Sequence, residues 1–499
     1  MDYIIVQAGG MGNRLKHLTK NKPKALVPIN NLPMIFHLFK LFPNKNFIII
    51  GDYKYEVLQK YITTFSDTFA TIINTKGKKG TCSGIAEALE FVPSDKSFMI
   101  IWSDLILPQN FDISNLPLGN YVGLSSDFSC RWRYENNEFE EISSINTGVA
   151  GLFIFKDKSV LADVLLEGEF VKWLKYKNIK FNTISLKGTK EFGILEEYEK
   201  LEKVKCRPFN EIIYSKNYII KKALDKQGEI LAKKELAWYK KVAQLGFKNI
   251  PQIYEENPLK LELIQGKNIY EYNNLVYENK LVILEHLVNT LSNLHELESV
   301  PVDIKSFEEN YLDKTFERID KVKNLIPFAT EKFITVNNRV CRNIFFYKEE
   351  VKELINNFKP KEFKLIHGDC TFSNIMLKND QTPILIDPRG YFGKTQFYGD
   401  VIYDWAKLYY SLSGNYDQFN LKNFTLDIDE NNKEITLKIK SNEWEKLEDK
   451  FFELINIDSM QIKLIHSLIW ISLTTYAWEN YDSICGAFYN GLYYLEECL

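Results

Sequence analysis

The sequence predicts an α/β protein built from two parts. Over roughly the first 200 residues, short apolar runs rich in Ile and Phe alternate with segments of helical pattern. This order is typical of βαβ units in a mainly parallel sheet. In the remainder, hairpin patterns come first and long amphipathic helices follow. At 499 residues the chain is longer than a single hydrophobic core usually supports, so at least two domains are expected.

The first part contains four predicted strands and three predicted helices. The strands are expected at 3–8, 46–52, 69–75 and 97–104, and the helices at 34–42, 54–65 and 82–92. A charged helical segment then leads towards Pro208, which would stop it. We therefore predict a first domain at 1–204 and a second domain at 205–499.

The second part is expected to form a small sheet-rich lobe, about 208–265, followed by a helical lobe, about 266–499. The helix at 229–246 would be capped by Gly246. The other predicted elements are a hairpin at 210–224, two strands within 250–266, a helix at 281–297, a hairpin at 424–439 and helical structure over 460–499.

Composition excludes several classes of protein. The formal net charge of −3 and the absence of a basic stripe with interleaved aromatic residues argue against nucleic-acid binding. No apolar run is long enough for a membrane span or an export signal, and the seven scattered cysteines include no CxxC pair. We expect a cytoplasmic protein that acts on small molecules. The sequence makes no prediction about its oligomeric state.

A glycine-rich turn follows the first predicted strand in "QAGGMGNRL". Glycines in such a turn let backbone N–H groups approach phosphates closely. Arg14 and, ten residues later, Lys24 in "NKPKAL" would direct two cations at a triphosphate. Such charges suit a reaction that releases pyrophosphate, because they neutralise the charge that develops on the leaving group.

These motifs resemble the signature of the sugar-phosphate nucleotidyltransferases and their phosphocholine cytidylyltransferase relatives, with Asn13 where the family usually has Thr or Ser. The resemblance implies a Rossmann-like, GT-A-like mixed sheet. It makes Arg14 and Lys24 catalytic, and Asp104 and Glu191 ligands for Mg²⁺, with Glu191 replacing the family's Asp. The implied nucleotide-binding residues are Ala8, Gly9, Gly10, Gly12, Asn13, Gly80, Thr81 and Ser83, and the implied acceptor-binding residues are Asn146, Thr147 and Gly148.

A second motif, "IHGDCTFSNI" followed by "LIDPRG", supplies the groups that phosphoryl transfer from ATP requires. Asp369 would orient or deprotonate the attacking hydroxyl, and Asn374 and Asp387 would hold Mg²⁺. The spacing resembles the aminoglycoside phosphotransferase and choline kinase superfamily, which implies a bilobal protein-kinase-like α+β fold. In that family an aspartate braces the catalytic loop, and Asp404 in "YDWAKL" stands at its position.

The same resemblance places an ATP-phosphate lysine after "YII", with Glu235 as its partner on the next helix. Either Lys221 or Lys222 can fill this role, because a register slip of one residue exchanges the two faces of a strand. Backbone groups around Glu262 and Leu263 would bind adenine at the hinge between the lobes.

The two activities can be consecutive. The kinase half would phosphorylate a sugar or polyol with ATP. The other half would then transfer a nucleotide to that phosphate, for a bacterial capsule or surface polysaccharide. The resemblance to a choline-kinase-like domain paired with a short transferase domain implies that this nucleotide is CMP from CTP. UTP and dTTP remain open as nucleotide substrates, and so does a kinase-like half that only binds.

A choline or ethanolamine acceptor is a further alternative. A quaternary ammonium group would need an aromatic cage, for which Trp102, Trp132, Tyr134 and Trp173 are the candidates.

Overall fold

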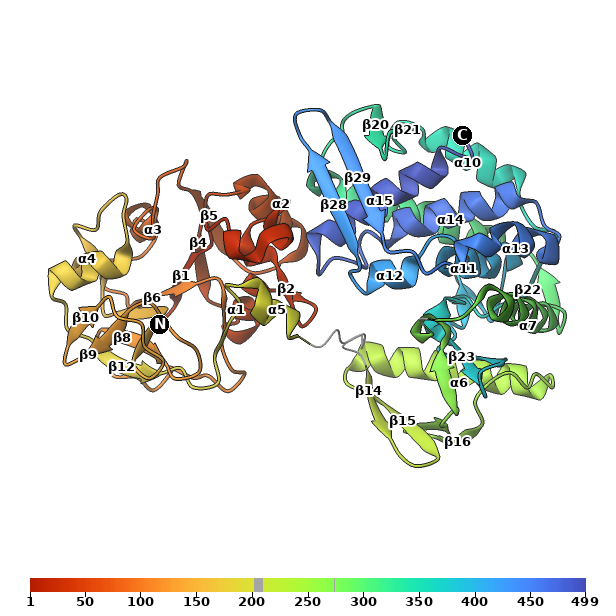
Figure 1. Ribbon diagram of the computed structural model, residues 1–499, viewed down its shortest axis with the longest axis horizontal. Helices are drawn as coiled ribbons and strands as arrows, with labels where there is room; N and C mark the ends of the chain where they lie inside the picture. The colour runs from red at the N-terminus through yellow and green to blue at the C-terminus, as the bar shows by residue number, and fades with distance from the viewer. Residues whose placement is uncertain (202–209, 273) are drawn as a thin grey trace. The chain divides into compact units, whose positions relative to one another are not determined.

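The computed structural model describes residues 1–201, 210–272 and 274–499 (Figure 1). The chain forms two compact units. The first comprises Met1–Glu202 and Ala477–Asp482, and the second comprises Lys203–Tyr476 and Ser483–Leu499. The predicted boundary between residues 204 and 205 and the predicted helix stop at Pro208 lie outside the described residues.

The first unit is built on a nine-stranded sheet. Its strands are β1 (Tyr3–Gln7), β4 (Asn46–Gly51), β5 (Ala70–Asn74), β6 (Phe98–Trp102), β8 (Tyr121–Ser125), β9 (Arg133–Glu135), β10 (Glu138–Glu140), β11 (Gly148–Phe155) and β12 (Asn182–Ser185). They follow the order β10–β9–β11–β6–β1–β4–β5, and β8 pairs with β11 and β12. Strand β1 is parallel to β4 and β6, whereas β11 is antiparallel to β6, so the sheet is mixed.

The helices of the first unit agree with the predicted βαβ pattern (Figure 1). They are α1 (Met34–Leu41), α2 (Tyr55–Phe65), α3 (Ile85–Leu89), α4 (Phe170–Lys177) and α5 (Leu195–Glu199), with 3₁₀ turns η1 (Asn13–Thr19), η2 (Lys24–Leu26) and η3 (Lys158–Leu161). The predicted helix at 82–92 is shorter in the structure, where Gly84 precedes it with φ +78°. Short strand pairs complete the unit: β2 (Pro28–Ile29) with β3 (Leu32–Pro33), and β7 (Leu105–Ile106) with β13 (Lys190–Glu191).

The second unit begins with a four-stranded sheet in the order β14–β15–β17–β16. These strands are β14 (Asn210–Tyr214), β15 (Tyr218–Ala223), β17 (Leu259–Glu262) and β16 (Ile253–Glu256). Helix α6 (Lys226–Gln244) contacts β15. Asp225 caps its first turn by accepting the Gly228 N–H at 2.7 Å, and Gly246 follows its last turn with φ +86°, as predicted.

The rest of the second unit is mostly helical, as predicted (Figure 1). Its helices are α7 (Tyr277–His295), α8 (Ile304–Glu308), α9 (Lys314–Val322), α10 (Lys348–Asn357), α11 (Val401–Leu412), α12 (Tyr416–Asn420), α13 (Glu448–Ile455), α14 (Ser459–Leu473) and α15 (Tyr481–Leu495), the last of which begins within the first unit. Shorter turns are η4 (Ile269–Glu271), the π-helical turn η5 (Glu309–Asp313), η6 (Lys323–Leu325), η7 (Phe372–Asn374) and η8 (Glu445–Leu447).

Small sheets accompany these helices. The strands are β18 (Gly266–Asn268), β19 (Ser299–Pro301), β20 (Phe333–Val336), β21 (Arg339–Arg342), β22 (Glu362–Leu365), β23 (Ile375–Lys378), β24 (Thr382–Leu385), β25 (Tyr391–Phe392), β26 (Thr395–Gln396), β27 (Tyr398–Gly399), β28 (Phe424–Asp429) and β29 (Glu434–Ile439). The hairpin predicted at 424–439 is formed by β28 and β29, in which Leu426 lies opposite Leu437. Within the described ranges, no helix combines the length and the apolar character of a membrane span.

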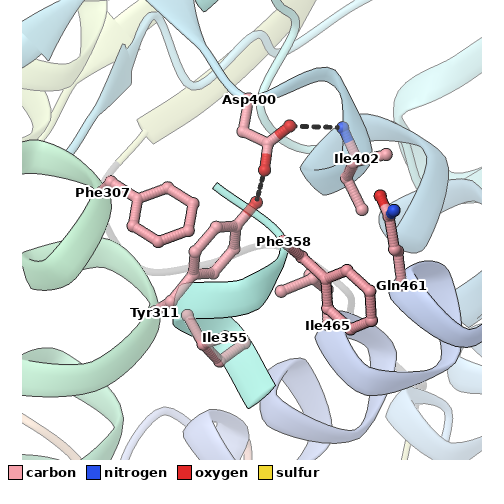
Figure 2. Close-up of a pocket in the computed structure, with 8 residues that line it drawn as sticks. All are labelled: Phe307, Tyr311, Ile355, Phe358, Asp400, Ile402, Gln461 and Ile465. Carbon is pink, nitrogen blue, oxygen red and sulfur yellow. Dashed lines mark hydrogen bonds between the residues drawn. The ribbon is translucent and has the colours of Figure 1, made fainter. Parts of the chain in front are cut away.

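A small cavity lies in the second unit between α8, η5, α10 and α14 (Figure 2). It is lined by Phe307, Tyr311, Ile355, Phe358, Asp400, Ile402, Gln461 and Ile465. The buried Asp400 carboxylate accepts hydrogen bonds from the Tyr311 hydroxyl and the Ile402 N–H, each at 3.0 Å. Burial raises the pKa of Asp400 to about 6, and the nearby Asp404 carboxylate adds to the rise. The cavity therefore contains a carboxylate whose ionisation is unfavourable, because burial removes it from water.

We expect Asp400→Asn to change how the stability of the second unit depends on pH. Because the pKa of Asp400 is higher in the folded state than in the unfolded state, the folded protein loses stability as pH rises from about 4 to about 6, and the loss persists above that range. The neutral amide lacks this loss. The thermal midpoint of the variant relative to the parent should therefore rise between about pH 4.5 and 7.5, by the equivalent of roughly 2 kcal/mol. The exposed Asp449→Asn is the matched control, and equal pH profiles for Asp400→Asn and the parent would contradict the assignment.

Candidate active sites

In the first unit, four of the predicted site residues lie together. Asp104 directly follows β6, and the Lys24 ammonium contacts its carboxylate. Strand β13 pairs with β7 so that Glu191 lies opposite Leu105, and this register brings Glu191 next to Asp104. Arg14 reaches the same place, with its Nη2 3.7 Å from Glu191 Oε1. Two carboxylates and two cations predicted from separate motifs thus form one cluster.

The electrostatics of this cluster favour a divalent cation. The pKa of Glu191 is raised, first by burial and then by the negative charge of Asp104, while Lys24 and Arg14 oppose the rise. Two carboxylates at close range repel each other unless a cation lies between them. Carboxylate oxygens are the ligands that Mg²⁺ prefers, so Asp104 and Glu191 fit the predicted metal site.

The glycine-rich turn packs against Lys24. Gly12 has φ +70°, and a Cβ on it would lie 3.2 Å from the Lys24 Cβ, so the close approach of the two segments requires glycine. The Ala8 N–H donates to the Ile50 carbonyl at 2.8 Å. A Cβ at Gly10 would meet no atom within 4 Å. Asn13 begins η1, the turn that carries Arg14.

The segment predicted to contact the base and ribose is held by hydrogen bonds. Gly80 has φ +92°, and a Cβ there would lie 2.3 Å from the Gly168 carbonyl oxygen. The Thr81 hydroxyl accepts the Phe170 N–H at 2.8 Å, and Gln7 of β1 donates to the Thr81 carbonyl at 2.8 Å. Ser83 is buried. The segment is therefore fixed to β1 and α4, and its nucleotide contacts stay a prediction.

The segment predicted to face the acceptor lies near Glu191. Asn146 is exposed, and the Thr147 N–H donates to the Ser144 hydroxyl at 3.1 Å. A Cβ on Gly148 would lie 2.8 Å from Cys130 Sγ, so these two residues are in close contact. Burial, followed by the charge of Glu191, raises the pKa of Cys130 to about 12. Because the charge of Glu191 acts on Cys130, the segment lies close to the carboxylate cluster.

The aromatic residues proposed as an ammonium cage do not form one. Trp132, Tyr134 and Trp173 are buried in the hydrophobic core. The Trp132 indole N–H donates to Glu169 at 2.6 Å. Trp102 is half-buried and packs against Gly151, where a Cβ would lie 2.1 Å from the ring. The three core residues have no open face for a quaternary ammonium group, and the structure does not favour a choline-like acceptor in this unit.

In the second unit, the choice between the two strand lysines is settled by their orientation. Lys221 is buried and its ammonium is 2.7 Å from Glu235 Oε1, whereas Lys222 is exposed. The Lys221 ammonium also contacts the Asp387 carboxylate. Lys221, Glu235 and Asp387 thus form the lysine, partner and metal-ligand arrangement that the resemblance implies.

Asp369 and Asn374 are joined by two hydrogen bonds. The Asn374 amide donates to Asp369 Oδ2 at 3.0 Å and to the Asp369 carbonyl at 2.9 Å. The Ile386 N–H donates to the Asn374 carbonyl at 3.0 Å, which brings Asn374 near Asp387. The predicted base and both predicted metal ligands therefore belong to one site.

Asp404 braces the catalytic loop as predicted. Its buried carboxylate accepts the N–H of His367 at 2.8 Å and that of Gly368 at 2.7 Å, and it lies 3.0 Å from His295 Nε2. Burial acts to raise the pKa of Asp404, but His295 and the loop N–H lower it overall. An ionised Asp404 therefore fixes the backbone that carries Asp369.

At the predicted hinge, the backbone N–H groups of Glu262 and Leu263 both already donate hydrogen bonds within the protein. The Glu262 N–H donates to the Gln252 carbonyl at 2.8 Å, and the Leu263 N–H donates to the Asn217 carbonyl at 3.1 Å. The Glu262 carboxylate is 2.6 Å from the Lys378 ammonium. Adenine binding through these two N–H groups would require these bonds to break. Binding at the two residues stays a prediction that the observed hydrogen bonds do not favour.

Each predicted metal site offers two protein side chains, Asp104 with Glu191 and Asp387 with Asn374. Among the described residues, no group of three or more His, Cys, Asp or Glu side chains is arranged around a common point. Mg²⁺ in nucleotide-binding sites usually takes one or two protein carboxylates and completes its shell with phosphate oxygens and water. Asp104 with Glu191, and Asp387 with Asn374, match this pattern.

Two known families match the two units. Residues 3–115 match the nucleotidyl transferase family, and residues 213–424 match the phosphotransferase enzyme family. The chain joins a nucleotidyltransferase to a phosphotransferase-family domain. This confirms both resemblances and the predicted α/β architecture, and we refer below to the nucleotidyltransferase unit and the phosphotransferase unit.

Individual relatives resemble only part of the chain. D-glycero-α-D-manno-heptose 1-phosphate guanylyltransferase of Campylobacter jejuni is 29% identical over 212 residues, which are 40% of this chain and 89% of that protein. Glucose-1-phosphate cytidylyltransferase of Salmonella typhimurium is 28% identical over 126 residues, which are 20% of this chain and 49% of that protein. The solved structure of CTP:phosphocholine cytidylyltransferase from Streptococcus pneumoniae is 19% identical, covers 40% of this chain and 98% of its own, and has a TM-score of 0.34.

One cation beside the phosphotransferase centre was missed by the sequence analysis. The Lys407 ammonium of α11 is 2.9 Å from Asp369 Oδ1. Burial acts to lower the pKa of Lys407, but the Asp369 carboxylate raises it overall. The available signal was spacing, since Lys407 follows Asp404 by three residues and so lies on the same helical face.

We expect metal binding by the nucleotidyltransferase unit to weaken as pH falls through the raised pKa of Glu191. The protonated carboxyl carries no charge and no longer attracts a divalent cation. Titration of Mn²⁺ with CTP, followed by electron paramagnetic resonance, should show this loss in the parent. Glu191→Asp should retain the pH dependence, and Glu191→Gln should bind Mn²⁺ at least about 10-fold more weakly with a flatter pH profile. The exposed Glu196→Gln is the control, and unchanged Mn²⁺ binding in Glu191→Gln would rule out the assignment.

Proposed function

We propose that the protein is a bifunctional kinase and nucleotidyltransferase. The phosphotransferase unit would transfer the γ-phosphoryl group of ATP to an alcohol, and the nucleotidyltransferase unit would then join that phosphate to CMP from CTP. The observation that carries the proposal is the double cluster: each unit brings an acid and a lysine from separate motifs to one place, Asp104 with Lys24 and Asp387 with Lys221.

In the phosphotransferase unit, the acceptor hydroxyl would attack the γ-phosphorus of ATP in line with the departing ADP oxygen. The Asp369 carboxylate would orient the hydroxyl and accept its proton. Lys221, fixed by Glu235, would neutralise charge on the phosphates that are not transferred. When bound at Asn374 and Asp387, Mg²⁺ would supply further neutralisation of the triphosphate. Lys407 would pair with the Asp369 carboxylate and hold it in position.

In the nucleotidyltransferase unit, an oxygen of the new phosphate would attack the α-phosphorus of CTP. The bond from that phosphorus to the bridging oxygen would break, and pyrophosphate would leave. Lys24 and Arg14 would stabilise the charge that develops on the pyrophosphate. The loop at Gly10 would let the triphosphate approach the backbone, since a Cβ at that position would meet no atom within 4 Å.

The kinase product is the substrate of the second reaction, and this relation accounts for the fusion. Two linked activities encounter their shared intermediate at a higher effective concentration than two separate proteins do. The product would be a CDP-activated sugar or polyol, the kind of building block used for capsule or surface polysaccharide. Cytidylyltransferases among the relatives support CTP, whereas the Campylobacter relative is named as a guanylyltransferase, so GTP belongs in the test alongside UTP and dTTP.

The proposal is tested by separating the two steps with one variant in each unit. The protein is incubated with ATP, one nucleoside triphosphate, Mg²⁺ and a panel of sugars, polyols and amino-alcohols, and products are followed by mass spectrometry. Asp369→Asn should lower ADP formation by about 100-fold or more, and an added phosphorylated acceptor should restore the nucleotide product. Asp104→Asn should instead accumulate the phosphorylated acceptor and release little pyrophosphate.

Each variant serves as the control for the other, because each should leave the reaction of the opposite unit unchanged. ATP consumption that is equal in Asp369→Asn and the parent would mean that the phosphotransferase unit only binds ligands. A higher rate with UTP, dTTP or GTP than with CTP would overturn the nucleotide assignment.

A further inference from the structure

Four cationic side chains and Asp369 form one charged cluster in the phosphotransferase unit, in which Lys314 interacts with the other four groups. Lys407 pairs with Asp369 at 2.9 Å, and the other three cations are Lys314, Arg318 and Arg389. Among the residues that the structure describes, none of these three has a carboxylate within ion-pair distance. With all four charged, the group carries four positive charges against the one negative charge of Asp369.

Arg389 is fixed beside the catalytic loop. Its backbone N–H donates to the His367 carbonyl at 2.9 Å, and a Cβ on Gly368 would lie 3.0 Å from the Arg389 Cβ. Its guanidinium donates to the Tyr403 hydroxyl at 2.8 Å and lies over the Tyr391 ring at 4.5 Å. Aromatic rings and a neutral hydroxyl therefore position this cation, and its charge is not cancelled.

Arg318 is positioned in a similar way from α9. Its guanidinium lies over the Tyr476 ring at 4.3 Å and donates to the Ser472 hydroxyl at 2.7 Å and to the Ser472 carbonyl at 3.1 Å. These partners are neutral. A planar guanidinium that is already oriented can bind a carboxylate or a phosphate with little further loss of side-chain freedom.

Lys314 lies one turn before Arg318 on the same helix. Burial, followed by the charges of Arg389, Arg318 and Lys407, lowers the pKa of Lys314 to about 5, and only Asp369 opposes this effect. An ammonium among three other cations is stabilised when an anion joins the group. The missing component of this cluster is thus a negative charge.

The face of α9 that carries these cations extends into the preceding π-helical turn, η5. Asn310, Lys314 and Arg318 are spaced four residues apart, which places them on one side of the helix. Asn310 is buried, and neither polar atom of its amide has a hydrogen-bond partner among the described residues. Single π-helical turns often occur at functional sites, and an unsatisfied buried amide is suited to a polar ligand.

We propose that the phosphoryl acceptor of this unit is an alcohol that also carries a negatively charged group, either a carboxylate or a phosphate monoester. The charged group would bind Lys314, Arg318 and Arg389, and the hydroxyl would face Asp369. This inference rests on the proposed kinase activity and narrows its substrate class. It excludes cationic acceptors such as amino-alcohols, because they would enter a region of like charge.

The nucleotide phosphates do not account for the cluster. The groups predicted to hold ATP are Lys221, on β15, and the metal ligands Asn374 and Asp387. Lys314 and Arg318 come instead from α9, and no hydrogen bond or ion pair among the described residues joins them to that set. An acceptor and a nucleotide would therefore be held near Asp369 by different sets of cations.

The test is calorimetric titration of the whole protein with adenylyl imidodiphosphate and Mg²⁺ present. The probes are matched pairs of equal size: D-glycerate against glycerol, and D-glucuronate against glucose. Glycerol 3-phosphate and glucose 6-phosphate form a second arm, which separates recognition of a carboxylate from recognition of a phosphate. Choline is the cationic probe. At least one acid should bind about 10-fold or more tightly than its neutral counterpart.

Variants identify the residues responsible. Lys314→Met keeps the length of the side chain and should weaken binding of the preferred acid at least about 10-fold, with binding of the nucleotide analogue unchanged. Lys314→Arg should restore much of the affinity. Lys321→Met, an exposed site on the same helix, is the control and should behave as the parent.

The inference would be overturned if no acid binds, or if neutral or cationic probes bind as tightly as the acids. It would also be overturned if Lys314→Met weakens binding of the nucleotide analogue and leaves binding of the acid unchanged. These outcomes are distinct from failure of the kinase proposal. That failure would appear as an absence of ADP formation with every acceptor, while the binding difference between acids and alcohols would still be measured.

Discussion

In each unit, one lysine ammonium contacts a carboxylate that is proposed to bind metal: Lys24 contacts Asp104, and Lys221 contacts Asp387. The arrangement suits a site that must receive a metal–triphosphate complex. The lysine and the carboxylate neutralise each other when no nucleotide is present. When the complex binds, the lysine can pair with phosphate and the carboxylate with Mg²⁺, so neither charge is left unpaired. Under the proposed function, this ion pair would neutralise both groups until the nucleotide binds.

The rest of each site is arranged around that pair. In the nucleotidyltransferase unit, the β7–β13 register supplies Glu191 as a second carboxylate. Its pKa is raised first by burial and then by the repulsion between the two acids. In the phosphotransferase unit, Glu235 holds Lys221, and Asp404 holds the loop that presents Asp369. Under the proposed function, each unit would bind a triphosphate with a divalent cation, and this shared ligand would account for the similar arrangement of charges in the two sites.

The sequence was sufficient where function depends on residues that are close together in the chain. The glycine-rich turn with Arg14 and Lys24, and the pair Asp369 and Asn374, are local motifs, and the structure brings each set together. The sequence was insufficient where the direction of a side chain decides which residue belongs to the site. Lys221 and Lys222 differ only in the face of β15 on which they lie, and the availability of hinge N–H groups depends on partners that no local pattern reveals.

The cationic cluster shows this limit most clearly. Its members come from α9, from the loop after Asp387 and from α11, so no window of sequence contains them, and a net charge of −3 conceals a local excess of positive charge. An acceptor that enters with one negative charge leaves with an added phosphate, and is then more strongly attracted to cations. In the proposed order of reactions, the next site contains Lys24 and Arg14. A preference for anions in the first step would therefore produce an intermediate whose charge favours binding in the second.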